Sequence, residues 1–147
     1  MIERDYIMRL VQQLAGVLMR IFKLKTQEEY EHALEETHRA YQELLGMSPE
    51  LMAAFDSAAL AQLLGHHEKV KAAAALFREE SELYRRTGDT TLAQARAQRA
   101  CELYLEAIQR QTRPDAECVA AVKFLVQFFP IQNFSVSYTD LLQKLAP

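Results

Sequence analysis

The chain has 147 residues, half of them hydrophobic, and a chain of this size forms one domain whose folding buries about 68–70% of the extended chain's surface. Its formal net charge of −3 excludes the basic surface by which proteins attract nucleic acid. The acidic start Glu3–Asp5 lacks the basic segment of a secretory signal, and no apolar run approaches the roughly 20 residues that span a bilayer. We therefore expect a cytoplasmic protein that binds neither nucleic acid nor membrane.

The first predicted helix, Ile2–Leu24, is apolar on nearly every side. Its clearest polar stripe consists of Asp5, Arg9, Gln12, Gly16, Arg20 and Lys23. Most of the remaining surface is occupied by Ile7, Leu10, Val11, Leu14, Val17, Leu18, Ile21 and Phe22. A helix on the surface of a domain needs only one apolar face. The pattern therefore places this helix at the centre of a bundle or at a contact with a second copy of the chain.

A second helix is predicted from the Thr-x-x-Glu pattern of a capping box at Thr26–Glu29. It ends at Gly46, a residue suited to the left-handed turn after a helix. Because so little chain separates Leu24 from Thr26, the two helices are predicted to form an antiparallel hairpin over about residues 2–46.

Short helices are predicted next, one after Ser48-Pro49 and one that begins at Asp56 or Ser57 and ends at Gly65. They lead into a longer hairpin.

The second hairpin is predicted over about residues 67–112. Its first helix runs from about His67 to Thr87, Gly88 ends that helix, and Asp89 caps the second. Small residues on the facing sides let the two helices approach closely. They are Ala73, Ala74, Ala93, Ala97, Ala100 and Ala107.

Two C-terminal helices complete a single domain, 1–147, of about seven helices. One covers about residues 114–129, beginning at Pro114 and Asp115 and ending before Pro130. The other covers about residues 137–146, where Ser137–Asp140 has a capping-box pattern.

The spacing around Gly88 resembles the tetratricopeptide repeat, a helix-turn-helix unit of about 34 residues. The matching positions are Phe77, Ser81, Tyr84, Gly88, Asp89, Ala93, Ala97 and Ala100. The first hairpin fits more loosely, and the small-residue anchors Ala33 and Ala93 are sixty residues apart rather than one repeat length. The resemblance implies an all-α fold of antiparallel hairpins with tetratricopeptide-like packing, without a regular array. The opening Asp5–Arg9 segment also resembles the start of a family of small bacterial helical proteins of unknown function.

The tetratricopeptide resemblance implies a concave groove lined by the first helix of each hairpin. Its partner-binding residues would be Leu18 and Phe22 in the first hairpin and Arg78, Glu82 and Arg85 in the second. Arginines in such a groove can hold a partner's carboxylate. The alternative interpretation is a charge network on an exposed helix face, with Glu82 between the two arginines. The apolar pair needs a cover, from the C-terminal segment or from another subunit.

The sequence contains no pattern that predicts catalysis, a cofactor or a metal site. The four glycines are isolated, which excludes a glycine-rich phosphate loop. Cys101 and Cys118 lack ligand spacing and are predicted to be buried thiols. Two Glu-x-x-His patterns, Glu29–His32 and Glu35–His38, share one helix and point in different directions, unlike a carboxylate metal site built from two helices. His66 is interpreted as part of a helix start.

Two functions remain open. The first is a non-catalytic interaction or scaffold protein that forms a homodimer through its first helix. A second self-association surface is expected at Phe124, Phe128, Phe129 and Phe134. The alternative is a protein that binds a small apolar ligand or lipid in a pocket enclosed by the first helix and this phenylalanine-rich segment.

Overall fold

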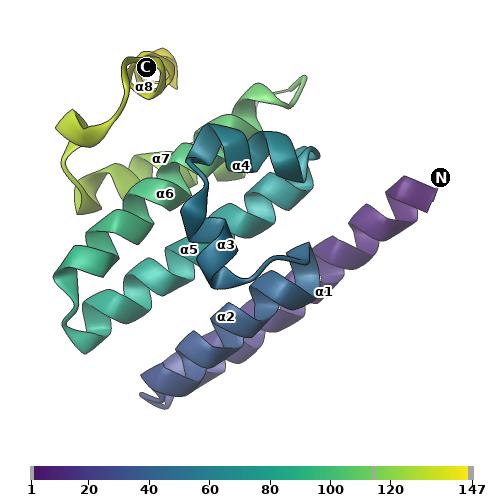
Figure 1. Ribbon diagram of the computed structural model, residues 1–147, viewed down its shortest axis with the longest axis vertical. Coiled ribbons are helices and arrows are strands. Elements are labelled where there is room, and N and C mark those ends of the chain that lie inside the picture. Colours follow the sequence, from purple (N-terminus) through teal and green to yellow (C-terminus); the bar gives the residue numbers. More distant parts are fainter. Residues whose placement is uncertain (1, 114, 146–147) are drawn as a thin grey trace.

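The computed structural model describes residues 2–113 and 115–145, and within them it contains eight α-helices, two short 3-10 helices and no strand (Figure 1). The all-α prediction is confirmed. The α-helices are α1 (Ile2–Thr26), α2 (Tyr30–Leu45), α3 (Pro49–Ala54), α4 (Ser57–Leu64), α5 (His67–Thr87), α6 (Thr90–Gln109), α7 (Ala116–Leu125) and α8 (Val136–Leu145), and the 3-10 helices are η1 (Val126–Phe128) and η2 (Ile131–Asn133).

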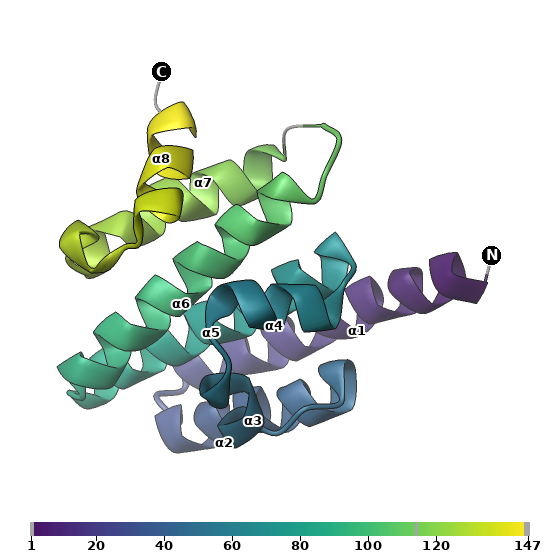
Figure 2. The same ribbon diagram turned by 45° about the horizontal axis from the view of Figure 1, so that its top comes forward.

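The architecture consists of two long helical hairpins with shorter helices attached (Figures 1 and 2). The first hairpin is α1–α2 and the second is α5–α6, and α5 packs against both helices of the first hairpin. The other side of the second hairpin is covered because α4, α7 and α8 all pack against α6. This order places α5 and α6 between α1 on one side of the molecule and α7 on the other.

Small side chains explain the close packing of α5 and α6. Ala73 and Ala74 on α5 and Ala97 and Ala100 on α6 are fully buried, so the two backbones approach each other closely. The Ser81 hydroxyl, also buried, donates a hydrogen bond of 2.7 Å across the pair to the Ala93 carbonyl.

Most predicted helix ends are confirmed because each is set by a local hydrogen bond. Asp56 accepts from the Ala59 amide at 2.8 Å, and Asp89 accepts from the Leu92 amide at 3.1 Å. Gly88 adopts a φ of 92°, which ends α5 in the left-handed turn. The predicted start at Pro114 lies outside the described residues, but Asp115 caps α7 through the Glu117 and Cys118 amides.

Both predicted capping boxes are wrong. Thr26 is the last residue of α1, and its hydroxyl donates to the Lys23 carbonyl at 2.7 Å instead of capping α2. The chain turns through Glu28, with a φ of 59°, and α2 begins at Tyr30. Contacts with α5 support the longer α1, because the Lys25 ammonium lies 2.8 Å from Glu79.

The second capping box fails because α8 starts earlier than predicted. Val136 opens the helix, so Ser137 lies within the first turn. The amide that closes this turn, that of Thr139, donates to the Ser135 carbonyl at 3.0 Å.

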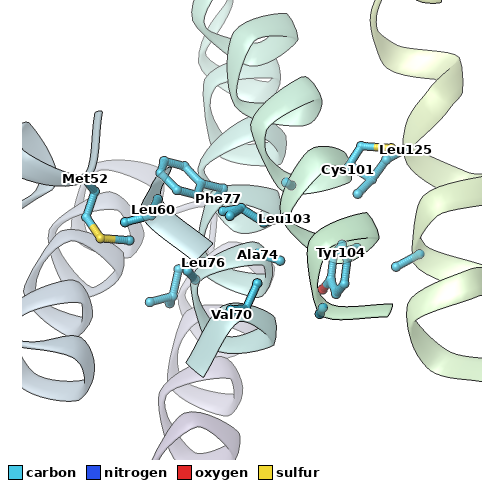
Figure 3. Close-up of a cluster of buried hydrophobic side chains, with 14 of the residues drawn as sticks. Met52, Leu60, Val70, Ala74, Leu76, Phe77, Cys101, Leu103, Tyr104 and Leu125 are labelled. Carbon is cyan, nitrogen blue, oxygen red and sulfur yellow. The ribbon is translucent and has the colours of Figure 1, made fainter. Parts of the chain in front are cut away.

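The hydrophobic core lies between α5 and α6 and the helices that cover them (Figure 3). Met52 of α3 and Leu60 of α4 reach it from one side and Leu125 of α7 from another, and all three are buried. By contrast, α1 lies at the edge of the molecule, and its N-terminal turns extend past the end of α2 (Figures 1 and 2). Of the two positions predicted for this helix, the one at the centre of the bundle is therefore wrong.

Candidate interaction surface

The α1 helix carries two parallel rows of apolar side chains. The first row packs against the domain and recurs at intervals of three and four residues, as in a helix-packing seam. Its members are Ile7, Leu10, Leu14, Val17, Ile21 and Leu24.

The second row, which we call the outer seam, faces away from the core. It consists of Met8, Val11, Ala15, Leu18, Met19 and Phe22. Five of the six directly follow a residue of the buried row, so the outer seam is rotated by about 100° around the helix. The exposed fractions of Met8, Met19 and Phe22 are 52%, 69% and 61%. The outer seam therefore presents large apolar side chains that the chain itself leaves uncovered.

The C-terminal segment does not cover the outer seam. α8 packs against α6, and η1 packs against α6 and α7, so both lie on the far side of the second hairpin from α1 (Figures 1 and 2). The predicted pocket between the first helix and the phenylalanine-rich segment is therefore wrong, because α5 and α6 separate the two.

The predicted phenylalanine surface is also largely absent. Phe129 and Phe134 are buried, with ring centroids 5.0 Å apart, because the chain folds back after η1 and brings α8 onto α6. The Phe128 ring is half-buried, and only Phe124 is substantially exposed. These four residues do not form one apolar face.

The five predicted partner-binding residues divide into separate groups. Leu18 and Phe22 lie in the outer seam. Glu82 accepts from Lys25 of α1 at 3.0 Å, and it also pairs with Arg86. Arg78 and Arg85 instead stack on the Phe124 and Phe128 rings, at 4.8 and 4.1 Å from the ring centroids. Glu82 therefore does not bridge Arg78 and Arg85, as the charge-network interpretation requires. Met8 and Met19 were not among the predicted residues, although the second row of apolar residues on α1 is visible in the sequence and includes both.

A buried carboxylate, that of Glu80, joins three helices. It accepts hydrogen bonds from His38 Nε2 and the Tyr41 hydroxyl of α2, at 2.7 and 2.8 Å, and from Arg96 Nε of α6 at 3.1 Å. Burial and the negative charge of Glu80 raise the pKa of Tyr41 well above its usual range. His38, considered above as a metal ligand, is thus held in a structural brace. The sequence offered no sign of this role, since Glu80 lies in a run of charged residues typical of a solvated surface.

Two further carboxylates hold the shorter helices on α6. Glu102 accepts from the Ser57 hydroxyl of α4 at 2.6 Å. Glu106 accepts from the Tyr138 hydroxyl of α8 at 2.7 Å and from Arg110 at 2.8 Å. These bonds compensate for the burial of the charged groups and fix the positions of α4 and α8.

Both cysteines are buried, as predicted, and burial raises each thiol pKa to about 12. At pH 8 such a thiol holds roughly a thousandfold less of the reactive thiolate than a free cysteine, whose pKa is about 8.5. We expect Ellman's reagent to label the native protein very slowly and to titrate two thiols once the protein is unfolded in guanidinium chloride. Rapid labelling of the native protein would contradict the burial of Cys101 and Cys118.

The histidines and acidic residues are dispersed. In residues 2–113 and 115–145, no three side chains of the metal-ligating types come together as a metal site would require. His66 caps the N-terminus of α5, because its Nδ1 accepts a 3.0 Å hydrogen bond from the Glu68 amide. No helix in this part of the chain is long and apolar enough to cross a membrane.

A family model described as a family of unknown function (DUF6483) matches residues 1–127. The chain belongs to this family. The match covers both long hairpins and reaches η1, whereas the resemblance noted for the opening Asp5–Arg9 segment concerned mainly the first hairpin. Comparisons with curated proteins and with solved structures found no match.

Proposed function

We propose that this DUF6483 protein is a non-catalytic interaction protein that self-associates through the outer seam of α1. The observation that carries the proposal is the uncovered apolar row from Met8 to Phe22, which extends along about 21 Å of helix at 1.5 Å per residue. Exposed apolar patches of this kind mark association surfaces, and pairing about a two-fold axis is the commonest arrangement of identical chains.

Burial of the outer seam against a second copy is favourable in free energy. Full burial of one Met or Phe side chain contributes about 1.5–3 kcal/mol, so several such residues in one row provide enough free energy for association after its entropic cost. Ala15 at the middle of the row lets a second helix approach closely.

We also propose that the two hairpins stack in a tetratricopeptide-like manner. This is supported by the position of α5, the first helix of the second hairpin, against both helices of the first. The sixty-residue separation of Ala33 and Ala93 then has a simple cause, because the short helices α3 and α4 are inserted between the hairpins.

Size-exclusion chromatography with light scattering tests the self-association. At micromolar concentration we expect twice the chain mass of 16.9 kDa. The double variant Met19→Glu/Phe22→Glu should give the mass of a single chain, because two carboxylates in the outer seam would have to be desolvated in the dimer.

The matched control is Leu63→Glu, which places a carboxylate at an apolar residue of α4 with a similar exposed fraction, 58%, and which should remain a dimer. Circular dichroism checks that each variant is folded. A single-chain mass for the unmodified protein contradicts the proposal, and native mass spectrometry that finds a co-purified lipid on that single chain would favour the ligand-binding alternative.

A further inference from the structure

We infer that the two copies pair through α1 in antiparallel orientation, about a two-fold axis that crosses the helices at Ala15. This inference rests on the self-association proposed above and adds the geometry of the pair. It follows from the positions of the large side chains along the outer seam and from the charges beside it.

Four residues of the outer seam are placed symmetrically about Ala15, whereas Leu18, three residues beyond it, has Gln12 at the matching position. Met8 and Phe22 each lie seven residues from Ala15, and Val11 and Met19 each lie four residues from it. A two-fold axis perpendicular to α1 at this point places Met8 on the second copy's Phe22 and Val11 on its Met19. Large side chains then meet on both sides of a small central residue, which is the self-complementary pattern that a two-fold interface requires.

The charges along α1 distinguish the antiparallel from the parallel arrangement. Asp5 and Lys23 are eighteen residues apart, about five helical turns, so they lie on one line beside the outer seam. Both are exposed, and neither forms an ion pair within the part of the chain that the structure describes. An antiparallel pair brings each Asp5 near the other copy's Lys23. In an in-register parallel pair, the two copies of each residue lie on opposite flanks of the contact, and neither Asp5 faces a Lys23.

The helix dipoles and the charges at the two ends of α1 also favour the antiparallel pair. The first turn of α1 carries Glu3 and Asp5, and its last turn carries Lys23 and Lys25. In an antiparallel pair, the positive N-terminal end of one helix lies beside the negative C-terminal end of the other. The N-terminal turns of α1 extend past the end of α2 (Figure 2), and Met8 within them is 52% exposed.

Cysteine cross-linking tests the orientation. Three variants, Ala15→Cys, Met8→Cys and Phe22→Cys, each place one reactive thiol in the outer seam, while the native cysteines are buried. Under mild oxidation, Ala15→Cys should form a disulfide-linked dimer with itself. Met8→Cys alone should not, because in the antiparallel pair its two copies lie about 21 Å apart along the helix axis. Mixing Met8→Cys with Phe22→Cys should produce a cross-linked mixed dimer.

If Met8→Cys and Phe22→Cys each cross-link to themselves, and mixing them gives no additional cross-linked dimer, the dimer is parallel. That result would overturn this inference and leave the proposed self-association intact. The absence of any dimer by light scattering would overturn both.

The effect of charge reversal on the dissociation constant is a second test, which does not depend on cross-linking. Sedimentation should show that Asp5→Lys or Lys23→Glu alone raises the dissociation constant about five- to tenfold, because each creates two like-charge contacts in the symmetric dimer. The double variant Asp5→Lys/Lys23→Glu should restore the original value. Lys123→Glu, at an exposed position of α7, is the control and should not change it. Unchanged dimerisation in both single variants would contradict the antiparallel arrangement.

Discussion

The Glu80→Ala substitution is expected to lower the free energy of unfolding by about 3–5 kcal/mol, the loss seen when one member of a buried charged pair is removed. The Glu80 side chain is only 3% exposed and accepts from His38, Tyr41 and Arg96. Without the carboxylate, the Arg96 guanidinium and the buried Tyr41 hydroxyl lose their acceptor, and little water can replace it. The contacts of α5 with α2 and α6 should weaken together.

Urea denaturation followed by circular dichroism measures this loss. Glu117→Ala is the control, because the Glu117 side chain is largely exposed and lies 3.8 Å from Lys71, so its removal should change stability by less than about 0.5 kcal/mol. All variants must be compared at one protein concentration, since the stability of a dimer depends on it. A loss below about 1 kcal/mol for Glu80→Ala would mean that the brace contributes little to the fold.

The Phe77→Ala substitution is expected to lower the free energy of unfolding by about 3–5 kcal/mol, which is the second large effect. Phe77 is almost fully buried in the core between α5, α6 and the short helices (Figure 3). Its ring lies 5.4 Å from the Tyr41 ring and 5.4 Å from the Arg99 guanidinium. Truncation removes these contacts and leaves a cavity that the surrounding helices cannot close.

Phe124→Ala is the matched control for Phe77→Ala, since Phe124 is a phenylalanine on α7 that is already 42% exposed. Phe124→Ala should lower the free energy of unfolding by less than half as much as Phe77→Ala. Equal decreases would contradict the assignment of Phe77 to the core. The Glu80→Ala and Phe77→Ala effects should not add in a double variant, because both residues contact Tyr41 and Arg96.

Helix identity and most helix ends were predictable because they depend on residues close in sequence. The Ser48 and Asp56 caps each bond an amide three residues ahead, and Gly88 supplies the left-handed turn within the same few residues. Where the prediction failed, at Thr26 and Ser137, the capping-box pattern was present, but α1 and α8 included these residues. At the end of α1, the contact of Lys25 with Glu79 of α5 outweighed the local signal.

The candidate site was predictable only in part. The periodicity of α1 shows an apolar surplus too large for one face, which is a local property of Ile2–Leu24. It does not show which of two rows the domain covers, because both repeat at three- and four-residue intervals and differ only by a rotation of about 100°. That choice came from the packing of α1 on α2 and α5. The burial of Glu80 likewise depends on His38 and Arg96, partners far away in the sequence that no local pattern encodes.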